Sequence, residues 1–363
     1  MNAAAAFSPD YLTARARFRS SSLALGCQLE EHSFPLQDPE GDPLTLDVAI
    51  FGSTRPRRAV VISSGTHGVE GFLGSAIQAA FLEGRLASWR PPEDAAVILL
   101  HALNPWGFAW RRRVNEDNVD LNRNFLLPGE RYEGAPARYA AVDGFLNPRE
   151  LRGGSLGFYP RALVEIARSG LGPIKEAVAG GQYDFPEGMF YGGGGPSHTQ
   201  ALLAAALPRW LGDAERVLHL DVHAGLGKRG TVKLLVDAPP DSEDARWAVE
   251  QFGARHVQLW SAKGVSYRVR GGLGPWCQAT LPRARYQLLS PEFGTYPLLQ
   301  VVSALRTENQ TWHWAGKDSA EALAARERLK EVFAPRDPRW RADAVTQGVA
   351  LASRLLERLV DRA

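Results

Sequence analysis

The stretch that most constrains the fold is residues 59–72, with the sequence AVVISSGTHGVEGF. Its first half, residues 60–63, is a short apolar run rich in β-branched side chains, which is typical of a buried strand. Gly65 interrupts this run, and after Gly71 apolar side chains recur at helical spacing up to Phe81. The stretch therefore predicts a strand, a loop and a helix in succession, a common arrangement at active sites in α/β proteins.

Apolar segments and helical patterns alternate along the rest of the chain. Further strands are predicted at residues 44–51, 95–103, 217–225, 231–236 and 286–293. Helices are predicted near the N-terminus and at residues 161–179, 200–211, 244–259, 297–308, 319–332 and 342–362. This order favours the α/β class, with a mixed, largely parallel central sheet covered by helices on both faces. No repeat or composition break marks a boundary, so we expect one domain over residues 1–363 with a loop-rich insertion at about residues 126–198.

Composition excludes several classes of protein. The chain is 45% hydrophobic and 23% charged, which are ordinary globular values, and its net charge of +2 calls for neither nucleic acid nor an anionic membrane. No run approaches the ~20 apolar residues of a membrane span, and the N-terminal segment lacks the apolar core of a secretory signal. Cys27 and Cys277 are the only cysteines, too few for a disulfide framework or a thiolate metal site. We expect a cytoplasmic protein, and its oligomeric state is left open.

His67 and Glu70 lie three residues apart in the glycine-flanked loop that follows the first strand. Zinc accepts imidazole nitrogen and carboxylate oxygen, and catalytic zinc sites commonly use three protein ligands and one water molecule. Alternatively, His67 caps the following helix and Glu70 lies in its first turn, where the helix dipole favours a negative charge. Because H-x-x-E is a short pattern, further ligands are needed to choose between these interpretations.

The predicted strand at residues 217–225 carries three ionisable side chains. His219, Asp221 and His223 alternate along it, so all three face the same side. Burying them without partners would be costly. Gly225 ends the strand, which places His223 at its carboxyl end, where parallel sheets bind ligands. Asp221 could orient His223 or pair with an arginine, and both readings remain open.

A set of four residues at strand ends matches what a hydrolytic zinc site requires. Such a site needs three ligands, an open position for water, and a carboxylate that takes a proton from the water. The four candidates are His67, Glu70, His223 and Glu292.

The motifs that contain these residues occur in a recognisable order. They are THGVE at residues 66–70, VDLNRNF at 119–125, LDVHAG at 220–225 and SPEFGT at 290–295. With them the sequence resembles the zinc carboxypeptidase superfamily over roughly residues 45–310, and in particular a bacterial branch labelled as a domain of unknown function.

The resemblance implies one Zn²⁺ ion bound by His67, Glu70 and His223, with Glu292 as general base and later proton donor. It also implies that Asn122 and Arg123 bind a substrate carboxylate, which a planar guanidinium can grip through two hydrogen bonds.

Other assignments from the resemblance are less specific. An arginine upstream of Asn122 is expected to stabilise the developing oxyanion, and among Arg111, Arg112 and Arg113 we favour Arg113, with Arg111 next. Tyr267 and Tyr296 are both candidates for a substrate contact. The glycine-rich segment 180–198 is either a flexible linker or a loop that frames the site.

The expected function is hydrolysis of an amide bond next to a free carboxylate, by a carboxypeptidase-like metallopeptidase acting on small peptides. The alternative is a deacylase of N-acyl amino acids, of the aspartoacylase or desuccinylase kind, because the motifs do not separate the two activities. A distant alternative is a non-catalytic binding protein on the same fold, although all four site residues are present. A serine hydrolase is not supported, since no G-x-S-x-G motif occurs.

Overall fold

The computed structural model of the 363-residue chain describes residues 3–137, 139–151, 158–160, 162, 164, 180–259 and 269–360. The strands are β1 (Gln28–Gln37), β2 (Pro43–Gly52), β3 (Arg58–Ser63), β4 (Ala95–His101), β5 (Arg216–Asp221), β6 (His223–Ala224), β7 (Val232–Val236), β8 (Val257–Leu259) and β9 (Arg285–Phe293). The α-helices are α1 (Tyr11–Ala24), α2 (Gly71–Phe81), α3 (Pro105–Ala109), α4 (Tyr139–Leu146), α7 (His198–Leu211), α8 (Glu243–Phe252), α9 (Leu273–Thr280), α10 (Leu298–Trp314), α11 (Ala320–Phe333) and α12 (Pro338–Val360). Shorter helical turns occupy Ala3–Ala6, Gly68–Glu70, Leu82–Leu86 and Leu121–Arg123.

The described strands form one mixed sheet in the order β1-β2-β4-β3-β5-β9-β7-β8, with β6 also paired to β9. Its centre is parallel, because β3 pairs in parallel with β4 and β5, and β5 does so with β9. Antiparallel pairs lie on both sides of this centre, between β2 and β4 and between β7 and β9. The mixed, largely parallel sheet predicted from the sequence is therefore confirmed.

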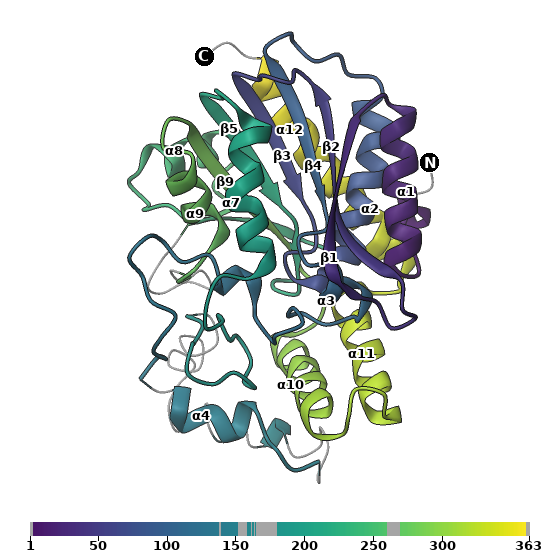
Figure 1. Cartoon of the computed structure of the whole chain (residues 1–363), viewed down its shortest axis with the longest axis vertical. Coiled ribbons are helices and arrows are strands. Elements are labelled where there is room, and N and C mark those ends of the chain that lie inside the picture. Colours follow the sequence, from purple (N-terminus) through teal and green to yellow (C-terminus); the bar gives the residue numbers. More distant parts are fainter. Residues whose placement is uncertain are drawn as a thin grey trace.

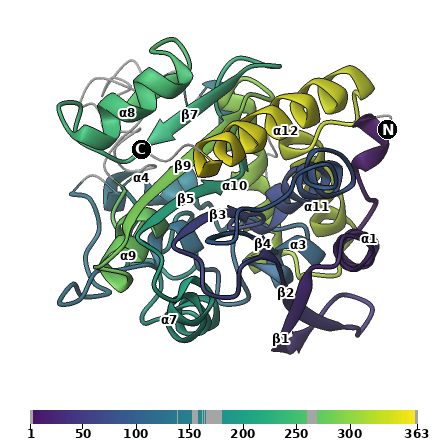
Figure 2. The ribbon, with the colours of Figure 1, turned by 90° about the horizontal axis from the view of Figure 1, so that it is seen from above.

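Helices cover both faces of the sheet, as Figures 1 and 2 show. Apolar side chains of α1, α2, α8 and α12 pack on one face, against residues such as Val60 and Leu218. Those of α7 and α9 pack on the other face, against residues such as Val61 and Val217. Because β3 and β4 are covered on both sides, their sequences are nearly continuous apolar runs. Helices α10 and α11 lie beyond one end of the sheet (Figure 1).

The predicted strands and most helices are present, but three regions differ from the sequence analysis. β1 was not predicted, because it is an edge strand with a largely exposed, polar sequence that also contains Pro35. The helix predicted at residues 244–259 ends at Phe252, since Gly253 adopts a φ of +84° and the chain then enters β8. Helix α9, which begins at Leu273, has no counterpart among the predicted helices.

The remaining differences are smaller. The strand predicted at residues 217–225 is divided at Val222 into β5 and β6, and α10 continues to Trp314, beyond its predicted end at residue 308. Of the helix predicted at residues 161–179, only residues 162 and 164 are described, and both are helical. Among the described helices, none is both long enough and apolar enough to cross a membrane.

Candidate metal centre

The loop that carries His67 and Glu70 is fixed by close backbone packing. It follows β3 and ends in a short helical turn, Gly68–Glu70, that leads directly into α2. The amide of Gly68 donates to the carbonyl of Arg113 at 3.0 Å, and that of Val69 donates to the carbonyl of Arg112 at 2.8 Å. A Cβ atom on Gly68 would lie 2.1 Å from the backbone of Gly107, so only glycine permits this approach.

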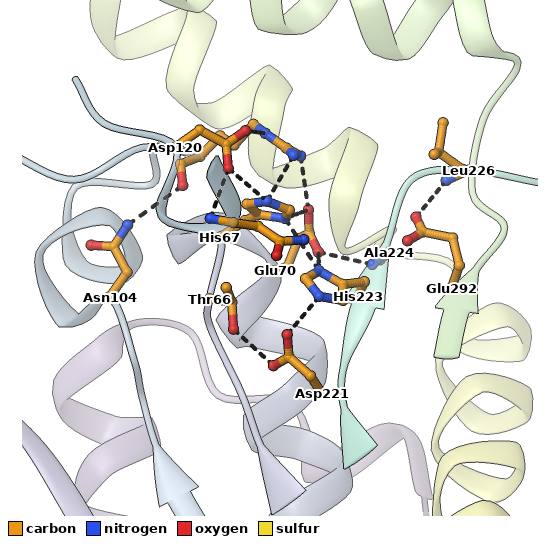
Figure 3. Close-up of polar contacts among 12 residues, drawn as sticks. Thr66, His67, Glu70, Asn104, Asp120, Asp221, His223, Ala224, Leu226 and Glu292 are labelled. Atoms are coloured by element: carbon orange, nitrogen blue, oxygen red, sulfur yellow. Dashed lines mark hydrogen bonds and ion pairs between the residues drawn. The ribbon is translucent and has the colours of Figure 1, made fainter. Parts of the chain in front are cut away.

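Three side chains meet at the carboxyl end of the parallel strands (Figure 3). The Nδ1 atom of His67 is 2.8 Å from Oε1 of Glu70, and Nδ1 of His223 is 3.1 Å from Oε2 of Glu70. The two Nδ1 atoms are 3.2 Å apart, and all three side chains are buried. In a tetrahedral zinc site with bonds of about 2.0–2.1 Å, neighbouring ligand atoms would be about 3.3 Å apart, so these spacings fit a zinc ion.

The outer nitrogen of each imidazole faces a carboxylate. Nε2 of His67 is 3.1 Å from Oδ1 of Asp120, and Nε2 of His223 is 2.7 Å from Oδ2 of Asp221. The backbone amide of Ala224 donates to Oε2 of Glu70 at 3.0 Å. Carboxylates behind histidine ligands are typical of metal sites, where they fix ring orientation. The donor set and its surroundings thus fit a divalent ion better than a helix cap.

Electrostatics at this centre favour an ionised Glu70. Burial by itself would raise the pKa of Glu70, but the adjacent His67 and His223 lower it below its usual value. The pKa of Asp120 is also well below its usual value, because Arg113 and His67 outweigh the effect of burial. Both carboxyl groups are therefore available as anions, one facing the metal position and one behind His67.

Glu292 lies beside this centre on the neighbouring strand, because the β6–β9 register pairs it with His223 (Figure 3). Its Oε1 atom accepts a hydrogen bond from the amide of Leu226 at 2.9 Å. Burial, with the charge of Glu70 adding to it, raises the pKa of Glu292 to about 7. A carboxylate with such a pKa suits proton transfer near neutral pH.

The three consecutive arginines have different surroundings. Arg113 Nε donates to Asp120 at 3.0 Å, its Nη1 atom is 3.3 Å from Glu70, and its Nη2 atom is 2.7 Å from Nε2 of His67. Arg112 is fully buried, and Arg111 forms an ion pair with Glu327. Only Arg113 therefore contacts the centre.

Arg123 is buried without a carboxylate partner among the described residues. Its Nη1 atom donates to the carbonyl of Asn122 at 2.8 Å, whereas its Nε atom has no hydrogen-bond partner. A buried guanidinium in this state is costly unless a ligand completes its hydrogen bonds. The arrangement fits the binding of an anionic group.

A cavity of about 340 Å³ connects these groups. The residues that line it near the metal centre are His67, Arg113, Asn122, Arg123, His223 and Glu292. Arg111 and Tyr296 do not line it, and the Tyr296 hydroxyl instead donates to Glu331 on α11 at 2.8 Å. The structure therefore brings neither Arg111, the second oxyanion candidate, nor Tyr296 to the cavity, and Tyr267 lies outside the described residues.

The glycine-rich segment 180–198 frames the loop that carries Arg123. Asn124 Nδ2 donates to the carbonyls of Gly192 and Gly195 at 2.8 and 2.9 Å, and the Tyr183 hydroxyl donates to the carbonyl of Arg123 at 2.7 Å. A Cβ atom on Gly181 would lie 2.5 Å from Cδ of Arg123. Of the two readings open from the sequence, the contacts favour the framing loop.

Sequence reasoning did not identify Asp120 as part of the site. Its position two residues before Asn122, in the motif VDLNRNF, was the available signal. The fold explains its role, because the Leu121–Arg123 turn sets Asp120 toward His67 while Asn122 and Arg123 line the cavity.

Comparisons with known proteins identify the family and the fold of this chain. The profile of the family described as "Protein of unknown function (DUF2817)" matches residues 7–347. No curated protein matches the chain. A solved structure of thrombin-activatable fibrinolysis inhibitor has a TM-score of 0.52 at 12% identity and covers 98% of this chain and 75% of its own.

Two further solved structures are more distant. Carboxypeptidase A from Helicoverpa armigera has a TM-score of 0.48 at 13% identity, covering 89% of this chain and 73% of its own. An aspartoacylase family protein from Mesorhizobium loti has a TM-score of 0.36 at 14% identity, covering 81% of this chain and 68% of its own. The carboxypeptidase-like fold expected from the motifs is confirmed, and the chain belongs to the DUF2817 family.

Proposed function

We propose that this protein is a zinc-dependent hydrolase that cleaves an amide bond next to a free carboxylate, in the manner of a carboxypeptidase-like peptidase. The observation that carries the proposal is the convergence of His67, Glu70 and His223, whose ligand atoms lie within 4.8 Å of one another. Glu292 and Arg123 line the same cavity, so a base and an anion-binding group face one substrate.

A Zn²⁺ ion held by the three ligands would polarise a substrate carbonyl and make a water molecule more acidic. Glu292 would take the proton of the attacking water on its carboxylate and deliver it to the leaving amine. The hydrogen bond from Leu226 to Oε1 holds that carboxylate in place, and its raised pKa supports both steps.

Arg123 and Asn122 would bind the free carboxylate of the substrate. The unpartnered Nε atom of Arg123 supports this assignment, since a carboxylate would supply the missing acceptor. Arg113 would stabilise the negative charge that develops on the carbonyl oxygen, because it lines the cavity beside His67.

The direct test measures amine release by the zinc-loaded protein. The substrates are short peptides, the same peptides with amidated C-termini, and N-acyl amino acids. We expect hydrolysis of substrates with a free carboxylate, loss of activity with a chelator, and recovery with zinc. Turnover of peptides would support the peptidase assignment, and turnover restricted to N-acyl amino acids would identify a deacylase instead.

Glu292→Gln provides the control for the catalytic base. The substitution keeps the size of the side chain but removes its ability to accept a proton, so turnover should fall by about 10²–10⁴-fold. Bound zinc should remain at the wild-type level, because Glu292 is not one of the three ligands. Undiminished turnover, or hydrolysis that persists without metal, would exclude this mechanism.

A further inference from the structure

A series of buried hydrogen bonds leads from His223 into the sheet, away from the cavity. Asp221 Oδ2 is 2.7 Å from Nε2 of His223, and its Oδ1 atom accepts from the Ser63 hydroxyl at 2.5 Å. Ser63 Oγ is also 2.7 Å from Nε2 of His219, whose Nδ1 atom is 2.7 Å from the hydroxyl of Tyr286. All five side chains are buried, and they come from β5, β6, β3 and β9.

Strand register explains how these residues meet. Ser63 and Asp221 are direct partners in the parallel β3–β5 pair. His219 precedes Asp221 by two residues on β5 and so shares its face. Tyr286 enters from β9, which pairs with β5 on its other side. The relay, by which we mean Asp221, Ser63, His219 and Tyr286, therefore crosses three adjacent strands.

Counting protons along the relay leaves one consistent arrangement. The single hydroxyl proton of Ser63 goes to Asp221, so the Ser63–His219 bond requires a proton on Nε2 of His219. Burial lowers the pKa of His219 to about 4, so its Nδ1 atom is free to accept from Tyr286. Each donor thus meets one acceptor, and no relay atom is among the buried polar atoms without a partner.

The same count places a proton on Nε2 of His223. Asp221 already receives the hydroxyls of Ser63 and Thr66 on Oδ1, which leaves Oδ2 to accept from Nε2–H of His223. In the neutral imidazole, the Nδ1 lone pair of His223 then faces Glu70 and Nδ1 of His67. This is the tautomer in which Nδ1 can bind a metal.

We propose that Ser63, His219 and Tyr286 are positioning residues that hold Asp221 in place and thereby present Nδ1 of His223 to the zinc. The inference rests on the proposed zinc site and adds residues that do not touch metal or substrate. A buried polar network costs more than apolar packing unless every member is satisfied, so its presence beside a ligand indicates a specific role.

The test compares the zinc affinities of two matched variants by chelator competition. Ser63→Ala breaks the relay between Asp221 and His219, and we expect zinc affinity to fall by up to about 10-fold, the lower end of the effect of losing a direct outer partner of a metal ligand, because Ser63 acts through Asp221. Ser64→Ala is the control, because Ser64 is adjacent, fully buried and hydrogen-bonded to Gln78 and Leu100, outside the relay. Its zinc affinity should stay at the wild-type value.

Substitutions at Tyr286 and His219 test the relay if the Ser63→Ala variant does not fold. Tyr286→Phe removes only the terminal hydroxyl of the relay, and we expect a loss of zinc affinity that is smaller than for Ser63→Ala. His219→Gln has a matched control in His101→Gln, since His101 is an equally buried histidine bonded to Ser75, outside the relay.

The outcomes separate the inference from the proposed function. If the wild-type protein binds no zinc, the proposed function fails. If the wild type binds zinc, and either the folded Ser63→Ala variant matches it or Ser64→Ala loses as much affinity, the relay has no positioning role. Unchanged affinity in Tyr286→Phe, when Ser63→Ala is unfolded, overturns the inference in the same way.

Discussion

Arg111, Arg112 and Arg113 are consecutive, yet each side chain meets a different carboxylate. Arg111 pairs with Glu327 on α11, and Arg113 reaches the metal centre. Arg112 pairs with Glu308 on α10. The divergence follows from the turn at Arg111, whose φ of +57° is unusual for a residue other than glycine. Because the partners of Arg111 and Arg112 lie about two hundred residues away, the sequence alone could not choose among the three arginines.

The candidate metal ligands and Glu292 could be predicted from the sequence more readily. His67, Glu70, His223 and Glu292 follow or end buried strands, and the carboxyl ends of parallel strands meet at one edge of a sheet. Tyr296 also follows a strand end, but its direction depends on the packing of α11, which the sequence pattern does not reveal.

Replacement of Arg123 tests whether the cavity recognises a carboxylate. In Arg123→Gln, kcat/KM for a substrate with a free carboxylate should fall by at least about 10- to 100-fold, since each charged hydrogen bond contributes about 1.5–3 kcal/mol. The amidated form of the same substrate should be cleaved equally slowly by variant and wild type. The measurement is the ratio of kcat/KM for the two substrates.

Arg111→Gln is the control for that ratio, because Arg111 does not line the cavity and is engaged with Glu327. Its preference for the free carboxylate should equal that of the wild type. A preference that survives in Arg123→Gln, or disappears in Arg111→Gln, would show that another residue binds the carboxylate.

At the scale of elements, a buried ion pair links α10 to the loop behind the metal centre. Arg112 is fully buried, its Nε atom donates to Glu308 at 2.6 Å, and its guanidinium lies 4.1 Å from the ring centre of Trp312. The carbonyl of Arg112 accepts from Val69, so the same residue supports the loop that carries Glu70. The pair therefore connects α10 with the short turn that precedes α2.

Glu308→Gln tests the contribution of this pair to stability. The substitution leaves the Arg112 cation buried without its counter-charge, so the free energy of unfolding should decrease by about 3–5 kcal/mol. Urea denaturation of both proteins would measure the change. As a reference, Glu215→Gln breaks the ion pair with Arg57, whose two side chains are each 64% exposed, and it should change stability by less than about 1 kcal/mol. Equal effects of the two substitutions would contradict the role given to the buried pair.

Elements differ in how far the sequence reveals them. The central strands β3 and β4 are strong apolar runs because the sheet is covered on both faces, and the sequence predicts them correctly. Edge strand β1 lacks this signal because only one of its residues, Phe34, is buried. The helical pattern after residue 243 continues past Gly253, although the chain there turns into β8 to pair with β7.

For the whole molecule, buried histidines predict how stability depends on pH. Burial lowers the pKa of His101, His219 and His313 to about 4 in each case. Between pH 6.5 and 4 these side chains gain protons in the unfolded chain but stay neutral in the folded one. The contribution of these three histidines to stability is therefore retained in full above pH 6.5 and is lost as the pH falls toward 4.

His101→Gln isolates one part of this dependence, because His101 is fully buried between Ser75 and the ring of Phe18. The wild type should lose about 3 kcal/mol more stability than the variant between pH 6.5 and 4, at 1.36 kcal/mol for each unit of pKa shift. Urea denaturation across that pH range would measure how the free energy of unfolding of each protein changes with pH. His198 is exposed, so the stability of the His198→Gln variant should change with pH as that of the wild type does. A His101→Gln slope equal to that of the wild type would show that His101 titrates alike in both states.

The central claim is that His67, Glu70 and His223 bind one zinc ion. Anomalous scattering at the zinc edge, from crystals grown with zinc and without chelator, tests it most directly. We predict one strong peak within about 2.0–2.2 Å of Nδ1 of His67, Nδ1 of His223 and a carboxylate oxygen of Glu70. A zinc-saturated crystal with no peak among these three side chains would contradict the account.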